Sequence, residues 1–167
     1  MKKPRIKYLK DYRPPAYLVD RVNLDIDLFD DHAMVNATLE IRPNEDISDR
    51  SPSLFLDGRE LELLSIDLDG TPLTSEDYET KEEGILVKPG KKPCVLKMTT
   101  RIHPRENTSL EGLYMAGNTF LTQCEAEGFR RITYFPDRPD VMSRYTVRIT
   151  ADKKRYPVLL SNGDLVS

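Results

Sequence analysis

Charged side chains crowd one segment of the chain, residues 122 to 140, whose sequence is TQCEAEGFRRITYFPDRPD. In it, Glu125 and Glu127 stand shortly before Arg130 and Arg131. An acid at a helix start is favoured by the helix dipole, by about 0.3 to 1 kcal/mol, and an acid one turn before an arginine forms an ion pair. A carboxylate in a partly dry cleft instead attracts a cationic ligand. The residues alone favour the first interpretation and leave the second open.

Gln123 and Glu125 lie two residues apart, at the end of an expected strand from Thr119 to Cys124. Successive side chains of a strand point to opposite faces, so the two would share a face if the strand continues. That spacing suits a shared pocket, although a glutamine on a strand is more often a plain surface amide. Cys124 would point the other way, as a small buried hydrophobe.

The other charges of the segment favour a supporting role. Glu127 is expected to be structural, as a solvated acid or the partner of an arginine. An ion-pair network that stiffens the corner after the strand is predicted for Arg130, Arg131, Asp137, Arg138 and Asp140.

Alternation of apolar and polar residues predicts strands along most of the chain. Residues 22–28 and 33–41 each place an apolar side chain at every second position, and residues 30–32 link them. This pattern predicts a long antiparallel hairpin. Further strands are predicted at residues 84–88, 94–102, 145–151 and 157–160.

Two Asp-Gly turn signals, at residues 57–58 and 69–70, bracket a predicted strand from Leu61 to Leu68. Its alternation slips at residues 63–64, which indicates a β-bulge. Many short strands with such turns predict an all-β fold, either a β-sandwich or an open twisted β-domain. We expect one domain over residues 1–167, with mainly antiparallel strands.

A brief helical pattern near residues 126–134 is the one helix that we expect. Phe129, Ile132 and Phe135 fall on one side of it, and Pro136 ends it, because proline cannot donate a backbone hydrogen bond and restricts the residue before it. The charged segment is therefore predicted to be a corner between a strand and a short helix.

Composition limits the classes of partner. The net charge is -3, and the charged residues are spread through both halves without a basic stripe. This argues against nucleic acid or an anionic membrane surface as a partner. The charged N-terminus has no apolar stretch after it, and no window is long enough to cross a bilayer, so we expect a cytoplasmic protein. In that compartment Cys94 and Cys124 are expected to be thiols.

Metal binding is not expected in this chain. The histidines, His32 and His103, show no ligand spacing, and a zinc site built from them with Cys94 and Cys124 is disfavoured because paired short spacings mark such sites.

Five motifs follow one another between residues 108 and 163, namely LEGLY, TQCEAEGFR, DRPDV, YP and LLSNG. In this order and spacing they resemble the N-terminal β-domain of the bacterial aminopeptidase N family, zinc aminopeptidases of the gluzincin class. The stretch DYRPP from Asp11 and the first hairpin extend the likeness to nearly the whole chain, and it is looser from Pro43 to Arg105.

This resemblance implies a saddle-like twisted β-sandwich that stands beside a catalytic domain and closes one side of its active site. It implies that Glu125 holds the α-ammonium group of the peptide substrate, and that Gln123 lines the rim of the first side-chain pocket. An α-ammonium group distinguishes the N-terminus of a peptide from its internal bonds, so the carboxylate would fix the first residue against the cleavage centre.

The resemblance also implies that the catalytic machinery lies outside this chain. The family uses His-Glu-x-x-His and a distant glutamate to hold zinc, and a Gly-Ala-Met-Glu-Asn motif, and none of these occurs here. We therefore expect no catalytic residue, no metal and no peptide hydrolysis in the chain alone, and an exposed apolar patch where the catalytic domain docks. A β-sandwich interaction module, or the equivalent domain of a catalytically silent relative, is the alternative.

Overall fold

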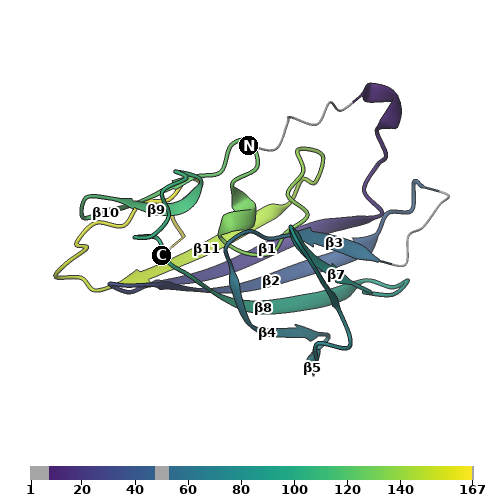
Figure 1. The fold of residues 1–167 in the computed structure, drawn as a ribbon, viewed down its shortest axis with the longest axis horizontal. Coiled ribbons are helices and arrows are strands. Elements are labelled where there is room, and N and C mark those ends of the chain that lie inside the picture. Colours follow the sequence, from purple (N-terminus) through teal and green to yellow (C-terminus); the bar gives the residue numbers. More distant parts are fainter. Residues whose placement is uncertain (1–7, 48–52, 167) are drawn as a thin grey trace.

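The computed structural model describes residues 8–47 and 53–166, and its regular structure consists of strands and two 3₁₀ helices (Figure 1). The charged start of the chain, residues 1–7, lies outside the described residues. The elements are η1 (Leu9–Asp11), β1 (Tyr17–Leu28), β2 (Ala33–Pro43), β3 (Leu54–Asp57), β4 (Glu62–Leu68), β5 (Thr71–Pro72), β6 (Glu79–Lys81), β7 (Gly84–Val87), β8 (Cys94–Ile102), β9 (Gly112–Ala116), β10 (Thr119–Gln123), η2 (Phe129–Arg131) and β11 (Arg144–Ala151).

These strands form three sheets, which confirms the all-β class. The largest has the order β11-β1-β2-β8-β4-β5, and the others pair β10 with β9 and join β3, β7 and β6. Neighbouring strands run antiparallel, except that β11 pairs in parallel with β1. Alternation along β11 predicted a strand correctly, but it carries no information about which strand is the neighbour or in which direction it runs.

The predicted hairpin is confirmed as β1 and β2. Val22, Leu24 and Ile26 are buried at alternate positions of β1, and Val35 and Leu39 are fully buried on β2. This period-2 burial places one face of the sheet against the core and the other in water.

The two Asp-Gly signals have different outcomes. At residues 69–70 the chain makes a two-residue turn between β4 and β5, with Asp69 and Gly70 both at positive φ, as such a turn requires. At residues 57–58 the chain bends without pairing the strands on either side, because β3 pairs with β7 and β4 with β8. The bulge is confirmed by the register shift between Leu63 and Ser65.

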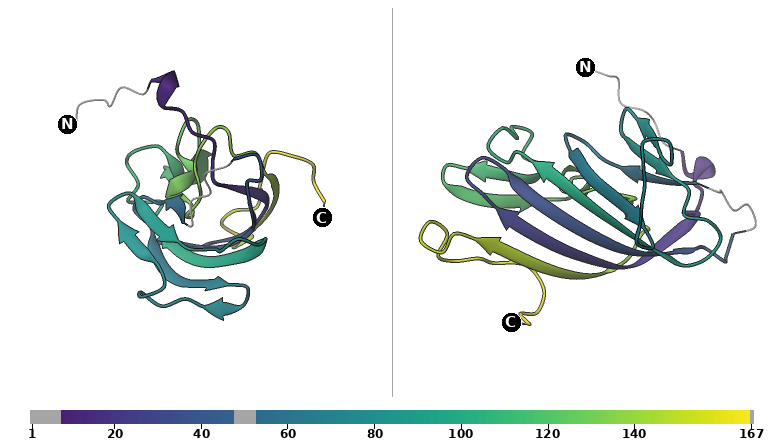
Figure 2. Two further views of the ribbon diagram at one scale, coloured as in Figure 1. Left: turned by 90° about the vertical axis from the view of Figure 1, so that its right-hand side faces the viewer. Right: turned by 90° about the horizontal axis from the view of Figure 1, so that it is seen from below.

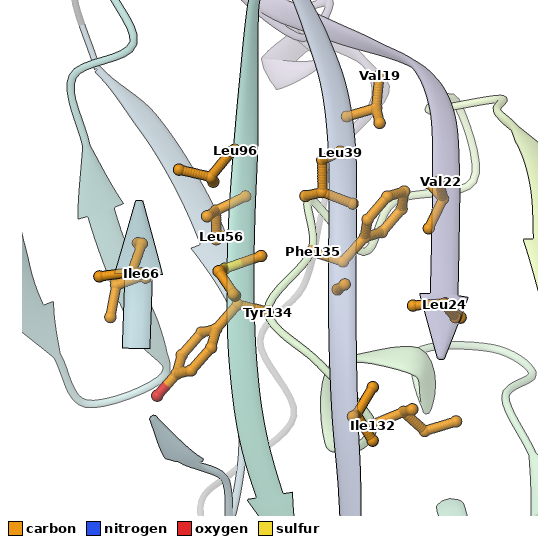
Figure 3. Close-up of a cluster of buried hydrophobic side chains, with 14 of the residues drawn as sticks. Val19, Val22, Leu24, Leu39, Leu56, Ile66, Leu96, Ile132, Tyr134 and Phe135 are labelled. Atoms are coloured by element: carbon orange, nitrogen blue, oxygen red, sulfur yellow. The ribbon is translucent and has the colours of Figure 1, made fainter. Parts of the chain in front are cut away.

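The core lies between the large sheet and the segments that cross its inner face. Figure 2 shows the sheet curving around the region that contains η2. In the close-up of Figure 3, Phe135 lies between Leu39 and Val22, and Ile132 and Tyr134 belong to the same cluster of buried side chains. The residues that follow η2 are therefore part of the core, and their packing fixes the position of the charged corner.

The expected short helix and the expected last strand have different outcomes. The short helix near residues 126–134 is present as a single 3₁₀ turn, η2. Residues 157–160 form no strand, since none of their backbone groups joins a sheet. Among the described residues no helix is long and apolar enough to span a membrane.

Candidate functional site

Gln123 and Glu125 lie where β10 leaves the small sheet. Gln123 is the last residue of β10 and pairs with Gly112 of β9. The strand ends there, and Glu125 begins a turn over residues 125–128. The alternate-residue rule therefore does not extend to Glu125, and the expectation of a shared strand face does not hold in that form.

A side-chain contact joins the two residues instead. Nε2 of Gln123 donates a hydrogen bond to the backbone carbonyl oxygen of Glu125 at 3.3 Å. Both side chains are exposed, and the peptide bond between Glu125 and Ala126 is cis. Within the described ranges, no hydrogen bond or ion pair reaches the Glu125 carboxylate, so its oxygens are available to a ligand.

Two glycines let the backbone of this corner pack closely. A β-carbon on Gly128 would lie 2.5 Å from the carbonyl oxygen of Gln123, and one on Gly112 would lie 2.6 Å from Cβ of Arg131. The Gly128 amide also donates to the carbonyl of Cys124 at 2.9 Å. The end of β10, the turn and η2 thus form one closely packed unit.

Replacing Gly128 with alanine is expected to lower the free energy of unfolding by about 1–3 kcal/mol, because the added methyl group overpacks this unit. Gly128 has a negative φ, so backbone strain does not contribute. Urea denaturation measures the loss, and the backbone amide NMR shifts of Gln123 and Cys124 should move. In the control Gly117→Ala the new methyl group meets no atom within 4 Å; its positive φ adds strain at the turn between β9 and β10, but no overpacking at the corner, so those shifts should stay. Unchanged shifts in both variants would contradict this role of Gly128.

Arg130 holds the corner to the core. Its Nε lies 2.9 Å from Oδ2 of Asp137, its Nη1 lies 3.3 Å from Oδ1 of Asp57, and its Nη2 lies 3.4 Å from Oε2 of Glu127. Arg130, Asp137 and Asp57 have side chains only 10%, 11% and 18% exposed. The predicted ion-pair network therefore exists, and a carboxylate from β3 completes it.

Burial sets the electrostatics of this cluster. It raises the pKa of the Asp57 carboxyl, against the opposing effects of the Arg130 guanidinium and of the Asp137 backbone N–H, which donates to Asp57 at 3.0 Å. Backbone bonds between Asp57 and Phe135, 2.8 and 3.1 Å long, hold β3 against the same segment. The cluster is stable only while the arginine balances its acids.

The other two arginines make separate contacts. Arg131, 8% exposed, donates from Nε to Glu111 at 3.1 Å and from Nη1 to Glu60 at 2.5 Å. Arg138 binds both carboxylate oxygens of Asp140, at 2.6 and 2.8 Å, which holds the pKa of that acid below its usual value. The predicted network thus consists of three clusters.

Asp57, Glu60 and Glu111 are the members of these clusters that the sequence did not reveal. Each lies 20 or more residues from its arginine, and no local pattern marks such a pairing. The only available signal of these partners was the pair of adjacent arginines at residues 130–131, because buried arginines require acidic partners.

Cys124 is half-buried between the two site residues, close to the expected arrangement. Burial, followed by the nearby charge of Asp137, raises the pKa of its thiol, and both cysteines are free. Across residues 8–47 and 53–166, no three histidine, cysteine or acidic side chains gather as metal ligands. The exposed polar groups at the corner are the carboxylate of Glu125 and the amide of Gln123.

The chain is similar in sequence to a known protein family. The model of the family described as the Peptidase M1 N-terminal domain matches residues 13–167. Aminopeptidase N of Caulobacter vibrioides is 44% identical over 164 residues, which cover 98% of this chain and 18% of that protein. The chain thus spans less than a fifth of the length of that relative.

Solved structures show the same fold. The crystal structure of Legionella pneumophila aminopeptidase A in complex with aspartic acid superposes with a TM-score of 0.89 at 37% identity, over 96% of this chain and 19% of that one. An M1 zinc metallopeptidase from Deinococcus radiodurans superposes with a TM-score of 0.66 at 15% identity, over 81% of this chain and 32% of that one. The second likeness concerns the fold alone.

Proposed function

Because the chain belongs to the Peptidase M1 N-terminal domain family, we propose that it is the substrate-anchoring domain of a zinc aminopeptidase that releases N-terminal amino acids from peptides. The observation that carries the proposal is the match over 98% of the chain to an aminopeptidase N, combined with an exposed carboxylate that meets no cation among the described residues and lies on a closely packed corner. The chain itself recognises the substrate and does not cleave it.

Glu125 is the proposed amine anchor. Its carboxylate has no competing cation among the described residues, whereas Glu127 beside it already pairs with Arg130. The α-ammonium group of a peptide, with an ordinary pKa near 7.7–8.0, is mostly charged at neutral pH and supplies the missing partner. Once the catalytic domain covers the site, exclusion of water strengthens this attraction.

Gln123 is proposed to line the rim of the pocket for the first side chain. Its amide nitrogen already donates to the Glu125 carbonyl, so the amide is oriented and its oxygen remains able to accept a hydrogen bond. The same hydrogen bond connects Gln123 at the pocket rim to Glu125, the anchor. The first side chain and the amino group of the substrate would therefore be positioned by the same corner of the domain.

The proposed partner of the domain is the catalytic domain of its own parent chain, which would carry the zinc. Exposed apolar side chains on β11 support this proposal. Tyr145 and Val147 are 48% and 38% exposed although they register with Val22 and Leu24 on the core-facing side of the sheet. The Tyr145 ring also packs against Phe129 and Phe135, so this strand face is partly open. A partly open apolar face is typical of a surface that another domain covers.

The parent protein tests this proposal. We expect its sequence beyond Ser167 to contain His-Glu-x-x-His, and the purified parent to hydrolyse aminoacyl arylamides. A zinc chelator such as 1,10-phenanthroline should abolish the activity and added zinc should restore it, while the 167-residue chain should be inactive with or without zinc. A parent without the motif, or activity that survives the chelator, would contradict the proposal and favour an interaction module.

A further inference from the structure

Arg130 reaches outward from the core to the turn that carries the amine anchor. The turn spans residues 125–128, and the carboxylate of Glu127 within it lies 3.4 Å from Nη2 of Arg130. The other side of the same guanidinium is fixed by Asp57 and Asp137. One side chain therefore connects the end of β3 to the turn.

The two sides of this arginine differ in exposure. Asp57 and Asp137 are 18% and 11% exposed, whereas Glu127 is 50% exposed. Because water screens it, the outer contact contributes little to folding stability. It can still select one orientation of the turn, since the guanidinium that it meets is itself held at a fixed position.

We propose that Arg130 is a positioning residue for the amine anchor, and that it acts through Glu127 to orient the turn so that the Glu125 carboxylate meets the substrate ammonium group. This inference rests on the proposed function. The same contact pairs the charge of Glu127 with that of Arg130, so the two acids of the turn have different roles. Glu127 faces the arginine and Glu125 faces the ligand.

The test uses the full-length parent enzyme and two inhibitors, leucine hydroxamate and its counterpart that lacks the α-amino group. The ratio of their inhibition constants measures the preference for the amine. Glu127→Gln, which keeps the shape of the side chain, and Arg130→Lys should each lower this ratio by about tenfold, as a small misplacement of a binding group does. Arg42→Lys is the control for the loss of a surface ion pair, because Arg42 on β2 pairs with Asp20 on β1 and both side chains are exposed.

A merely structural role predicts something else. It would weaken both inhibitors equally and leave the ratio unchanged, which would overturn the inference. In a parent that already carries Glu125→Ala, adding Glu127→Gln should change the ratio no further, because the anchor is gone. A further drop of similar size would contradict action through Glu125.

The outcomes also separate this inference from the function on which it rests. If Glu125→Ala abolishes the amine preference while Glu127→Gln and Arg130→Lys retain it, the positioning role is wrong and the proposed function stands. If Glu125→Ala itself retains the preference, the proposed function fails and the inference fails with it. If Arg130→Lys does not fold, Glu127→Gln decides alone, since Glu127 is 50% exposed and its contact adds little to stability.

Discussion

Replacing Glu125 with alanine in the full-length parent enzyme is expected to lower kcat/KM for peptides with a free N-terminus by about 30-fold or more, equivalent to about 2 kcal/mol. The reason is that the substrate ammonium group, once enclosed, would lose its charge partner and remain desolvated. Steady-state kinetics with a dipeptide series measures the effect. Glu125→Gln should show most of the same loss, because it removes the charge and keeps the shape.

The control for this prediction is a carboxylate of similar exposure elsewhere. Glu76 is exposed in the turn between β5 and β6, away from the small sheet that carries the site. Glu76→Ala should leave kcat/KM unchanged. Gln123→Ala should fall between the two, with a loss of roughly 2- to 10-fold that depends on the first side chain, the scale of one neutral hydrogen bond. Wild-type kinetics in Glu125→Ala would refute the anchoring role.

Replacing Arg130 with methionine is expected to lower the free energy of unfolding by about 3–5 kcal/mol, because it leaves the charges of Asp57 and Asp137 buried without their cation. Urea denaturation of the chain measures this loss. Arg42→Met is the control, since Arg42 and Asp20 are 43% and 49% exposed and the loss there should stay below about 1 kcal/mol. Equal losses in the two variants would contradict the role of the cluster.

The loss in Arg130→Met should also depend on pH. Arg130 opposes the effect of burial on Asp57, so removing it raises the pKa of Asp57 further. A carboxyl group whose pKa is higher in the folded state destabilises the fold when ionised, and protonation relieves that penalty. The difference from wild type should therefore be largest at pH 7 and should shrink as the pH falls toward 3.8, the ordinary pKa of an aspartate. A difference that grows on acidification would contradict this explanation.

The strands and their faces were predictable because alternation is a local property. The β1–β2 hairpin and the bulge near Leu64 follow from the order of side chains alone. The parallel pairing of β11 with β1 was not predictable, since it joins residues more than 100 positions apart and the alternation of both strands is compatible with other neighbours. The Asp57-Gly58 signal misled for a related reason, because the backbone of Asp57 pairs with distant Phe135.

At the proposed site, the sequence supplied the candidate residues but not how they are held. Gln123 and Glu125 were selected by resemblance, and the structure places them together at the end of β10 through a side-chain to backbone bond. The support from Gly112 and Gly128 depends on close backbone approach, which no local pattern announces. Glycine in a charged segment reads as a flexible turn, whereas here it allows tight packing.

A crystal structure of the parent enzyme with a bound amino-acid hydroxamate tests the central claim most directly. The account predicts that one oxygen of the Glu125 carboxylate lies within about 2.7–3.2 Å of the inhibitor's amino nitrogen, the range of a charge-assisted hydrogen bond. An amino group bound to other side chains, with the Glu125 carboxylate out of hydrogen-bonding reach, would contradict it.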